Sequence, residues 1–243
     1  MNLILLFKND FIEYTNSVQI KGRRLKHIID VHRAQLGDRL TVGLENEKIG
    51  IGTITKLNKD ILEMEVSLTI EPPVPSPINL ILALPRPKVI SRVLLSASSL
   101  GIKKIWLINA NRVEKSYWQS PRLDEDNIKK QLILGLEQSK DTIMPTVVKK
   151  KLFKPFVEDE LPGLIKGTSP VVAHPVTNNK CPGKINGPVT LAIGPEGGFI
   201  PYETEKLIEC GFYPFHIGER ILRVETVIPA LTALLTFQTA PLP

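Results

Sequence analysis

Two glycine-punctuated segments late in the chain contain the residues that could do chemistry. The first is LAIGPEGGF, residues 191–199, where an apolar run meets the turn Gly194–Gly198. Glycines at such a turn let a ligand reach backbone N–H and C=O groups directly. A carboxylate repels an anion, so Glu196 argues against a phosphate-binding loop. The segment favours a ligand that is cationic or offers neutral hydrogen-bond donors, and an ordinary tight turn is the alternative.

The second segment is HIGERILRVETV, residues 216–227, which passes through Gly218 toward an expected helix. Its apolar residues could wall a pocket while its charged residues face a reaction centre. These charged residues are Glu219, Arg220, Arg223 and Glu225. The alternative is that they form ordinary ion pairs at the start of a helix, each worth little.

Several classes of site and location are disfavoured by the sequence. Neither a GxGxxG fingerprint nor a GxxxxGK[ST] loop is present, which argues against dinucleotide and P-loop binding. The two cysteines, Cys181 and Cys210, are too few and too far apart for a disulfide framework or a zinc site. No apolar run is long enough to cross a bilayer, and the opening MNLILLF is expected to be a first strand. We therefore expect a cytoplasmic protein without a metal or a membrane anchor.

The elements that must position both segments follow a proline-rich stretch, EPPVPSP, at residues 71–77. Apolar, strand-like runs then alternate with stretches of helical periodicity, which predicts an α/β domain over 78–243 with a mostly parallel sheet. The expected strands are 78–84, 104–109, 170–174, 189–194 and 213–218. The expected helices are 89–100, 128–140, 201–210 and 226–237, the last with Thr226 as its N-cap. Both glycine segments then follow strands, at the edge of the sheet where ligands bind.

Residues 1–70 have a different pattern, which predicts a small β-barrel domain joined to the α/β domain by the linker 71–77. Short β-branched runs at 40–44, 48–57 and 61–70 are separated by Gly, Asn and Asp turns. A helix within 22–34 would carry a cluster of basic residues.

The formal net charge of +6 favours a polyanionic partner. Part of this charge is local, in the 21–33 stretch and at Lys149, Lys150 and Lys151. A solvated basic face is the alternative to nucleic-acid binding. Candidate RNA contacts are Arg23, Arg24, Lys26, His27 and Arg33.

Taken together, the two glycine segments resemble the RsmE family of 16S ribosomal RNA uridine N3-methyltransferases, within the SPOUT superfamily. That family has a GPEGG loop and, about two dozen residues later, a G-x-R-I-L-R-x-E-T-A motif; here they stand at 194–198 and 218–227. Glu137-Gln138-Ser139 resembles a further family motif, and HIIDVHR…GD at 27–38 resembles the family's amino-terminal pattern. The resemblance covers most of the chain.

The resemblance implies an α/β, SPOUT trefoil-knot methyltransferase domain preceded by a small PUA-like β-barrel. It implies a homodimer that acts on small-subunit ribosomal RNA and takes its methyl group from S-adenosyl-L-methionine, bound bent and largely by main-chain groups. The residues expected to hold this cofactor are His174, Ile193, Gly194, Pro195, Gly197, Gly198, Ile217, Gly218, Ile221 and Leu222. For His174 the alternative is a satisfied histidine of the core or of a turn.

The expected chemistry is removal of the N3 proton of a uridine followed by in-line methyl transfer. Proton loss places negative charge on O2 and O4, and the Arg223 guanidinium is the group expected to stabilise it. Glu196 or Glu225 could accept the proton or orient the arginine. An unperturbed carboxylate is a weak base for this proton, which favours the orienting role.

This chain departs from the family pattern in four places, mostly on the expected RNA-facing side. They are Pro85-Arg86-Pro87-Lys88, Ser99-Leu100-Gly101, Lys140 and Val227. Two other functions stay open: a SPOUT methyltransferase acting on another RNA or base atom, and a non-catalytic RNA-binding factor of ribosome assembly. A titration with S-adenosylmethionine distinguishes the second of these, because an assembly factor need not bind it.

Overall fold

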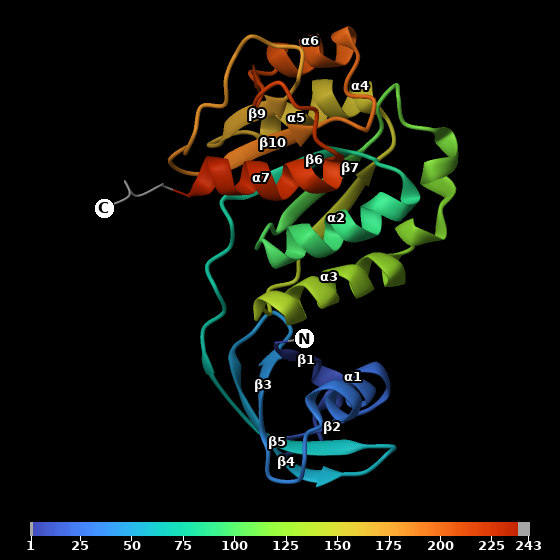
Figure 1. The fold of residues 1–243 in the computed structure, drawn as a ribbon, viewed down its shortest axis with the longest axis vertical. Coiled ribbons are helices and arrows are strands. Elements are labelled where there is room, and N and C mark those ends of the chain that lie inside the picture. Colours follow the sequence, from blue (N-terminus) through green and yellow to red (C-terminus); the bar gives the residue numbers. More distant parts are fainter. Residues whose placement is uncertain (1, 238–243) are drawn as a thin grey trace. The chain divides into compact units, whose positions relative to one another are not determined.

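The computed structural model describes residues 2–237, which divide into two compact units (Figure 1). The first contains the described residues up to Val74 together with Ile133–Met144, and the second contains the remainder. The division falls at 74/75, inside the proline-rich stretch 71–77. The membership of Ile133–Met144 in the first unit was not expected from the sequence.

The first unit is built on a five-stranded sheet with the order β1-β3-β4-β5-β2. Its strands are β1 Ile4–Leu6, β2 Ser17–Ile20, β3 Arg39–Leu44, β4 Ile49–Leu57 and β5 Leu62–Ile70. The β1–β3 pair is parallel and the other pairs are antiparallel. Strands β1 and β2 stand at the two ends of this order, and the sheet is curled into a half-barrel, in agreement with the small β-barrel domain expected from the sequence. The pattern missed β2, which has only four residues.

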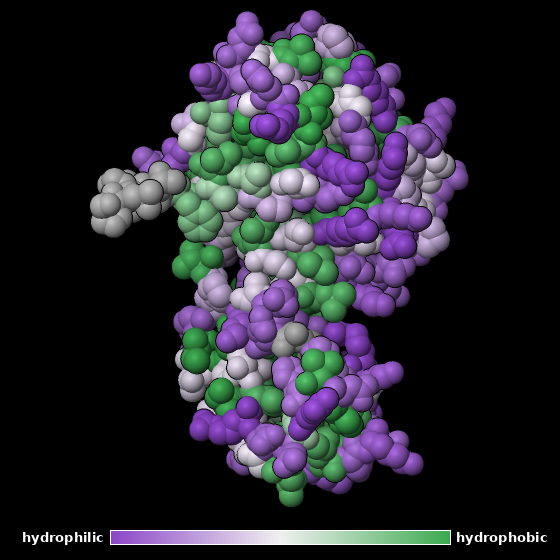
Figure 2. Space-filling model, viewed as in Figure 1, coloured by the Kyte–Doolittle hydropathy of each residue, from purple (hydrophilic) through white to green (hydrophobic). Residues whose placement is uncertain are grey.

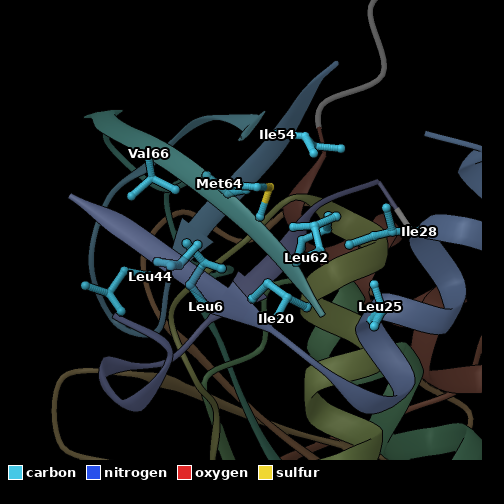
Figure 3. Close-up of a cluster of buried hydrophobic side chains, with 12 residues drawn as sticks. Leu6, Ile20, Leu25, Ile28, Leu44, Ile54, Leu62, Met64 and Val66 are labelled. Carbon is cyan, nitrogen blue, oxygen red and sulfur yellow. The ribbon is translucent and has the colours of Figure 1, made fainter. Parts of the chain in front are cut away.

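The core of this unit lies between the sheet and helix α1, Gly22–His27, with the helical turn Ile28–His32 that continues it (Figure 3). Strand β5 alternates strictly: Leu62, Met64 and Val66 are buried while the side chains between them are more exposed. Leu25 and Ile28 face these strands from the helical segment. Every second side chain of the strand thus packs against one face of the helix, as expected for a sheet with one buried face.

The second unit is an α/β domain around a six-stranded sheet with the order β11-β9-β10-β6-β7-β8. All five strand pairs are parallel, which confirms the predicted sheet. Its strands are β6 Ile78–Ala83, β7 Lys104–Ile108, β8 Thr146–Lys150, β9 Ser169–Ala173, β10 Val189–Ile193 and β11 Tyr213–Phe215. Strand β10 is buried along its whole length, as its continuous apolar run predicts.

Helices α2 Pro87–Ser99 and α7 Val224–Thr236 pack against each other (Figure 1). The other helices are α3 Glu125–Ser139, α4 Phe153–Pro155, α5 Leu161–Leu164 and α6 Pro201–Glu209. Pro201 opens α6, as expected from its fixed φ and missing N–H. None of the helices within residues 2–237 has the length and apolar character that crossing a bilayer demands.

Several boundaries differ from those predicted. Strand β11 ends at Phe215, and α7 begins at Val224 with Arg223 as its N-cap in place of Thr226. Pro229 therefore lies in the second turn, where its missing N–H leaves the carbonyl of Glu225 without a helical donor. Strand β8 and the short helices α4 and α5 were not predicted. The knot stays a prediction, because strand order does not describe how the chain threads.

Candidate functional site

A cavity of about 260 Å³ lies where the carboxyl ends of β9, β10 and β11 meet the start of α7. Its walls come from the loops after these three strands and from α7, so both glycine segments face one space. Every residue predicted to hold a cofactor lines this cavity except Gly197. Arg223 and Glu196 also line it, whereas Glu225 does not. The parallel sheet explains this convergence, since carboxyl ends of neighbouring strands meet at one edge.

Sequence reasoning missed part of the lining. The further lining residues are Ala173, Pro175, Phe215, His216, Arg220, Val224, Val227 and Leu231. Phe215, Val224 and Leu231 are buried and make that part of the wall apolar. Most of the missed residues directly precede or follow predicted ones, so extending each predicted loop by a few residues would have found them. Leu231 is the exception, because only the packing of α7 brings it to the cavity.

The glycines of the first segment have different structural reasons. A Cβ on Gly194 would lie 2.9 Å from the backbone N of Phe199, because the loop folds back on itself there. The Gly198 N–H closes the turn by donating to the Pro195 carbonyl at 2.7 Å. Gly198 and Gly218 have φ of +74° and +130°, and open space surrounds both positions. Gly194 is therefore required by the loop itself, while Gly198 and Gly218 leave backbone open toward a ligand.

Gly197 is not among the residues that line the cavity. The Arg112 guanidinium donates to its carbonyl oxygen. A Cβ on Gly197 would lie 2.9 Å from Cδ of that arginine. The missing side chain of Gly197 makes room for Arg112, from the loop after β7. Its predicted contact with the cofactor stays a prediction.

Glu196 lines the cavity, but its carboxylate is engaged on another loop. Its Oε1 accepts a hydrogen bond from the backbone N–H of Arg86 at 3.0 Å. This contact joins the glycine-rich loop to the loop after β6. Glu225 lies in the first turn of α7, where a negative charge is favourable near the helix N-terminus.

Two histidines border the cavity. The His174 backbone N–H donates to the Phe215 carbonyl at 2.9 Å, which joins the loops after β9 and β11. Burial lowers the pKa of the His174 ring, so the ring is neutral at pH 7. His216 Nδ1 accepts from the Gly218 N–H at 3.1 Å and so holds the turn at Gly218 in place. No pattern in the sequence indicates this role of His216.

The model of the RNA methyltransferase domain family matches residues 72–236, about two thirds of the chain. This chain belongs to that family. The methyltransferase is 25% identical to ribosomal RNA small subunit methyltransferase E 1 of Borreliella burgdorferi, over 96% of this chain and 97% of that one. It is 26% identical to ribosomal RNA small subunit methyltransferase E of Treponema pallidum, over 96% and 90%.

Solved structures have the same fold over nearly the whole methyltransferase. A Legionella pneumophila methyltransferase solved with bound S-adenosylmethionine superposes with a TM-score of 0.74, at 22% identity over 96% of both chains. Ribosomal RNA small subunit methyltransferase E of Neisseria gonorrhoeae, also solved with S-adenosylmethionine, gives 0.73 at 21% identity over 95% of both chains. These likenesses show that the chain has the fold of those two solved structures. The family model and the curated relatives confirm the resemblance to ribosomal RNA small subunit methyltransferase E.

The basic residues predicted to contact RNA lie in the first unit of this methyltransferase. They differ in how far their side chains are exposed and in whether they are already paired with a carboxylate. Arg24 donates to both carboxylate oxygens of Asp10, at 2.6 and 2.7 Å, and to the Leu5 carbonyl. Its side chain is only 15% exposed, so it is better explained by the packing of this unit than by RNA binding. Arg23 pairs with the buried Glu137 at 2.9 Å.

The other three residues of this basic cluster differ in charge and exposure. Lys26 and Arg33 are exposed. His27 packs edge-on against His32, and burial lowers its pKa, so the ring is neutral at pH 7. Lys26 and Arg33 are therefore the members of the cluster best placed to offer charge to a phosphate. Within residues 2–237 no group of three or more His, Cys, Asp and Glu side chains could hold a metal ion.

Proposed function

We propose that this chain is an S-adenosylmethionine-dependent methyltransferase that modifies N3 of a uridine in 16S ribosomal RNA in the cytoplasm. One observation carries the proposal: two glycine segments that are separate in sequence enclose one cavity, with Arg223 in its lining. The names of the curated relatives support ribosomal RNA of the small subunit as the substrate. The two solved neighbours support S-adenosylmethionine as the donor.

The residues of the cavity fit this donor. Ile193, Phe215 and Leu231 offer buried apolar surface to an adenine ring. Open space at Gly198 and Gly218 leaves main-chain groups accessible to a nucleoside. A lining carboxylate, Glu196, is compatible with a cationic ligand and would repel a phosphate. When bound, S-adenosylmethionine supplies an electrophilic methyl group on a sulfonium.

The residues of the chain then act by position and charge. Arg223 stabilises the negative charge that develops on the uracil oxygens as the N3 proton passes to solvent water. Glu196 orients the loop through Arg86. Glu225, two residues from Arg223 in the first turn of α7, orients that arginine. The remaining increase in the rate of methyl transfer comes from holding the base in line with the methyl group.

Nucleoside mass spectrometry of 16S ribosomal RNA, from cells with and without this chain, tests the proposal. We expect 3-methyluridine only where the chain is present. A different methylated base would favour the alternative of a SPOUT enzyme with another target. Absence of S-adenosylmethionine binding in a calorimetric titration would favour the non-catalytic assembly factor.

We also propose a homodimer. Leu234, Phe237 and Ile221 are 46%, 71% and 81% exposed in and beside α7. Green, apolar surface follows α7 on the face shown in Figure 2. Exposed apolar patches of this kind mark interaction sites. Light scattering after size exclusion should give twice the 27.1 kDa mass of the chain.

A further inference from the structure

A buried carboxylate lies in the helix that follows the glycine-rich loop. It belongs to a residue outside the sequence motifs described above. Glu203 in the first turn of α6 is only 3% exposed. Its Oε2 accepts from the Ile200 N–H at 3.0 Å, and its Oε1 accepts from the Asn111 N–H at 2.6 Å. Asn111 belongs to the loop after β7, 92 residues earlier in the chain. One side chain thus ties the end of the glycine-rich loop to a distant loop.

Two further contacts act on the same loop from the same side. Arg112, next to Asn111, donates to the Gly197 carbonyl, and Glu196 accepts from the Arg86 N–H at 3.0 Å. In the sheet, β6 and β7 lie on one side of β10, while β9 and β11 lie on the other. The loop after β10 is therefore anchored to the loops after β6 and β7, and its opposite side lines the cavity with the loops after β9 and β11.

We propose that Glu203 is a positioning residue for methyl-donor binding, with Arg112 as its partner in the same task. Together they hold residues 194–200 in the conformation that lines the cavity before the donor arrives. A glycine-rich loop that is free loses much conformational entropy when a ligand orders it. A loop that is ordered in advance avoids this cost at binding. The part of this proposal that concerns the donor rests on the proposed function.

The chemistry of the contact distinguishes Glu203 from a neutral isostere. Each carboxylate oxygen accepts from a different backbone N–H, and such charge-assisted bonds are the stronger kind. Glutamine has one acceptor oxygen, and its amide nitrogen only donates. Glu203→Gln therefore leaves one backbone N–H without an acceptor, so one of the two hydrogen bonds is lost.

The test compares Glu203→Gln with the wild-type full-length chain. Without ligand, amide hydrogen exchange of residues 194–200 should be at least tenfold faster in the variant. The Kd for S-adenosylmethionine should rise at least tenfold, while kcat at saturating donor changes less than threefold. Glu205→Gln is the matched control, because Glu205 is an exposed carboxylate on the same helix, and it should leave all three quantities unchanged.

Arg112→Ala is the second variant, and it carries the test if Glu203→Gln does not give a folded protein. It should speed exchange in the same loop and raise the Kd at least threefold. The inference is overturned if a folded variant exchanges and binds like Glu205→Gln. If the wild-type chain itself does not bind the donor, the proposed function fails, while the exchange comparison still decides whether Glu203 orders the loop.

Discussion

Arg223 and Gly194 are the single residues on which the chemistry and the shape of the cavity most depend. Arg223 is an exposed side chain whose backbone caps α7, so its removal should leave the fold intact. Gly194 cannot be replaced by a residue with a side chain without moving its loop, because backbone atoms of that loop occupy the space of a Cβ. The first residue is therefore expected to affect the rate, and the second to affect donor binding.

Replacing Arg223 by alanine should lower kcat about 10²–10³-fold, because one donor to the developing uracil anion is lost. The Kd for S-adenosylmethionine should change less than threefold. Methyl transfer to 16S ribosomal RNA at saturating donor measures the first quantity and calorimetry the second. Arg223→Lys, which keeps the charge but loses the planar fork, should recover part of the rate. Unchanged turnover in Arg223→Ala would remove the residue from the mechanism.

Gly194→Ala should weaken S-adenosylmethionine binding more than tenfold. Its Cβ would lie 2.9 Å from the Phe199 N and 3.2 Å from the Gly198 Cα, so the backbone of the loop must move. Gly163→Ala is the control, since nothing lies within 4 Å of a Cβ there. Equal donor affinity of the two variants, measured by calorimetry, would contradict this reason for the glycine.

At the scale of elements, helix α3 connects to the first unit through its final turns. The backbone N–H groups of Asn2 and Leu3 donate to the Glu137 carbonyl at 2.8 and 3.0 Å. Leu136 packs with Leu3, Leu5 and Ile49 in one buried cluster. The Glu137 side chain is buried and pairs with Arg23. The Glu137-Gln138 stretch, noted in the sequence as a motif, thus supports the packing of this unit.

The Glu137 carboxyl provides a test of this packing through pH. Burial raises its pKa, and the Arg23 guanidinium only partly opposes the rise. A carboxyl with a raised folded-state pKa destabilises the fold as pH rises through that pKa. Glu137→Gln should therefore be at least as stable as the wild type at pH 7, and its advantage should grow as pH rises from about 4.5.

Thermal unfolding between pH 4.5 and 8 measures this difference. Glu13→Gln, which removes an exposed carboxylate of the same unit, should show no such trend. A loss of stability in Glu137→Gln at pH 7 would mean that the ion pair with Arg23 outweighs the cost of burial.

At the scale of the whole molecule, we expect that cutting the chain at the proline-rich stretch does not give two stable parts. Residues Ile133–Met144 belong to the first unit although they follow the linker in sequence. They supply Leu136 to the cluster of Leu3, Leu5 and Ile49, with Ile133 and Met144 packed against it. Burying one leucine side chain is worth about 2 kcal/mol, a large share of the stability of a small domain.

Residues 1–74 produced alone should therefore lack a cooperative thermal transition, and residues 75–243 alone should bind a hydrophobic dye. Circular dichroism and dye fluorescence measure these outcomes. The control is the full-length chain cut at a protease site introduced between residues 72 and 77, which should remain folded and associated. Cooperative melting of the 1–74 fragment at the temperature of the intact chain would contradict the shared core.

Local pattern was sufficient to predict the class of fold and two of the loops that line the cavity. The continuous apolar runs of β6 and β10, each followed by a helix, predicted a parallel sheet without knowledge of strand order. The glycines at 194–198 and 218 marked two of the loops that line the cavity, because turns of this kind are specified by adjacent residues. Short elements such as β2 carried too few residues for any period to be visible.

The direction in which each side chain of the site points was decided only by tertiary structure. Glu196 bonds to Arg86, Gly197 accommodates Arg112, and Glu203 holds Asn111, across separations of 110, 85 and 92 residues. The same holds for Arg23, which pairs with Glu137 114 residues away. Sequence spacing governs contacts within a turn or an element. The partners of Glu196, Gly197 and Glu203 meet because the order of strands in the sheet brings distant loops to one edge, and Arg23 meets Glu137 because α3 ends in the first unit. The residue types and their spacing therefore predicted the kind of chemistry available to this protein. Only the packing decided whether a given residue lines the cavity, anchors a loop or lies in the core.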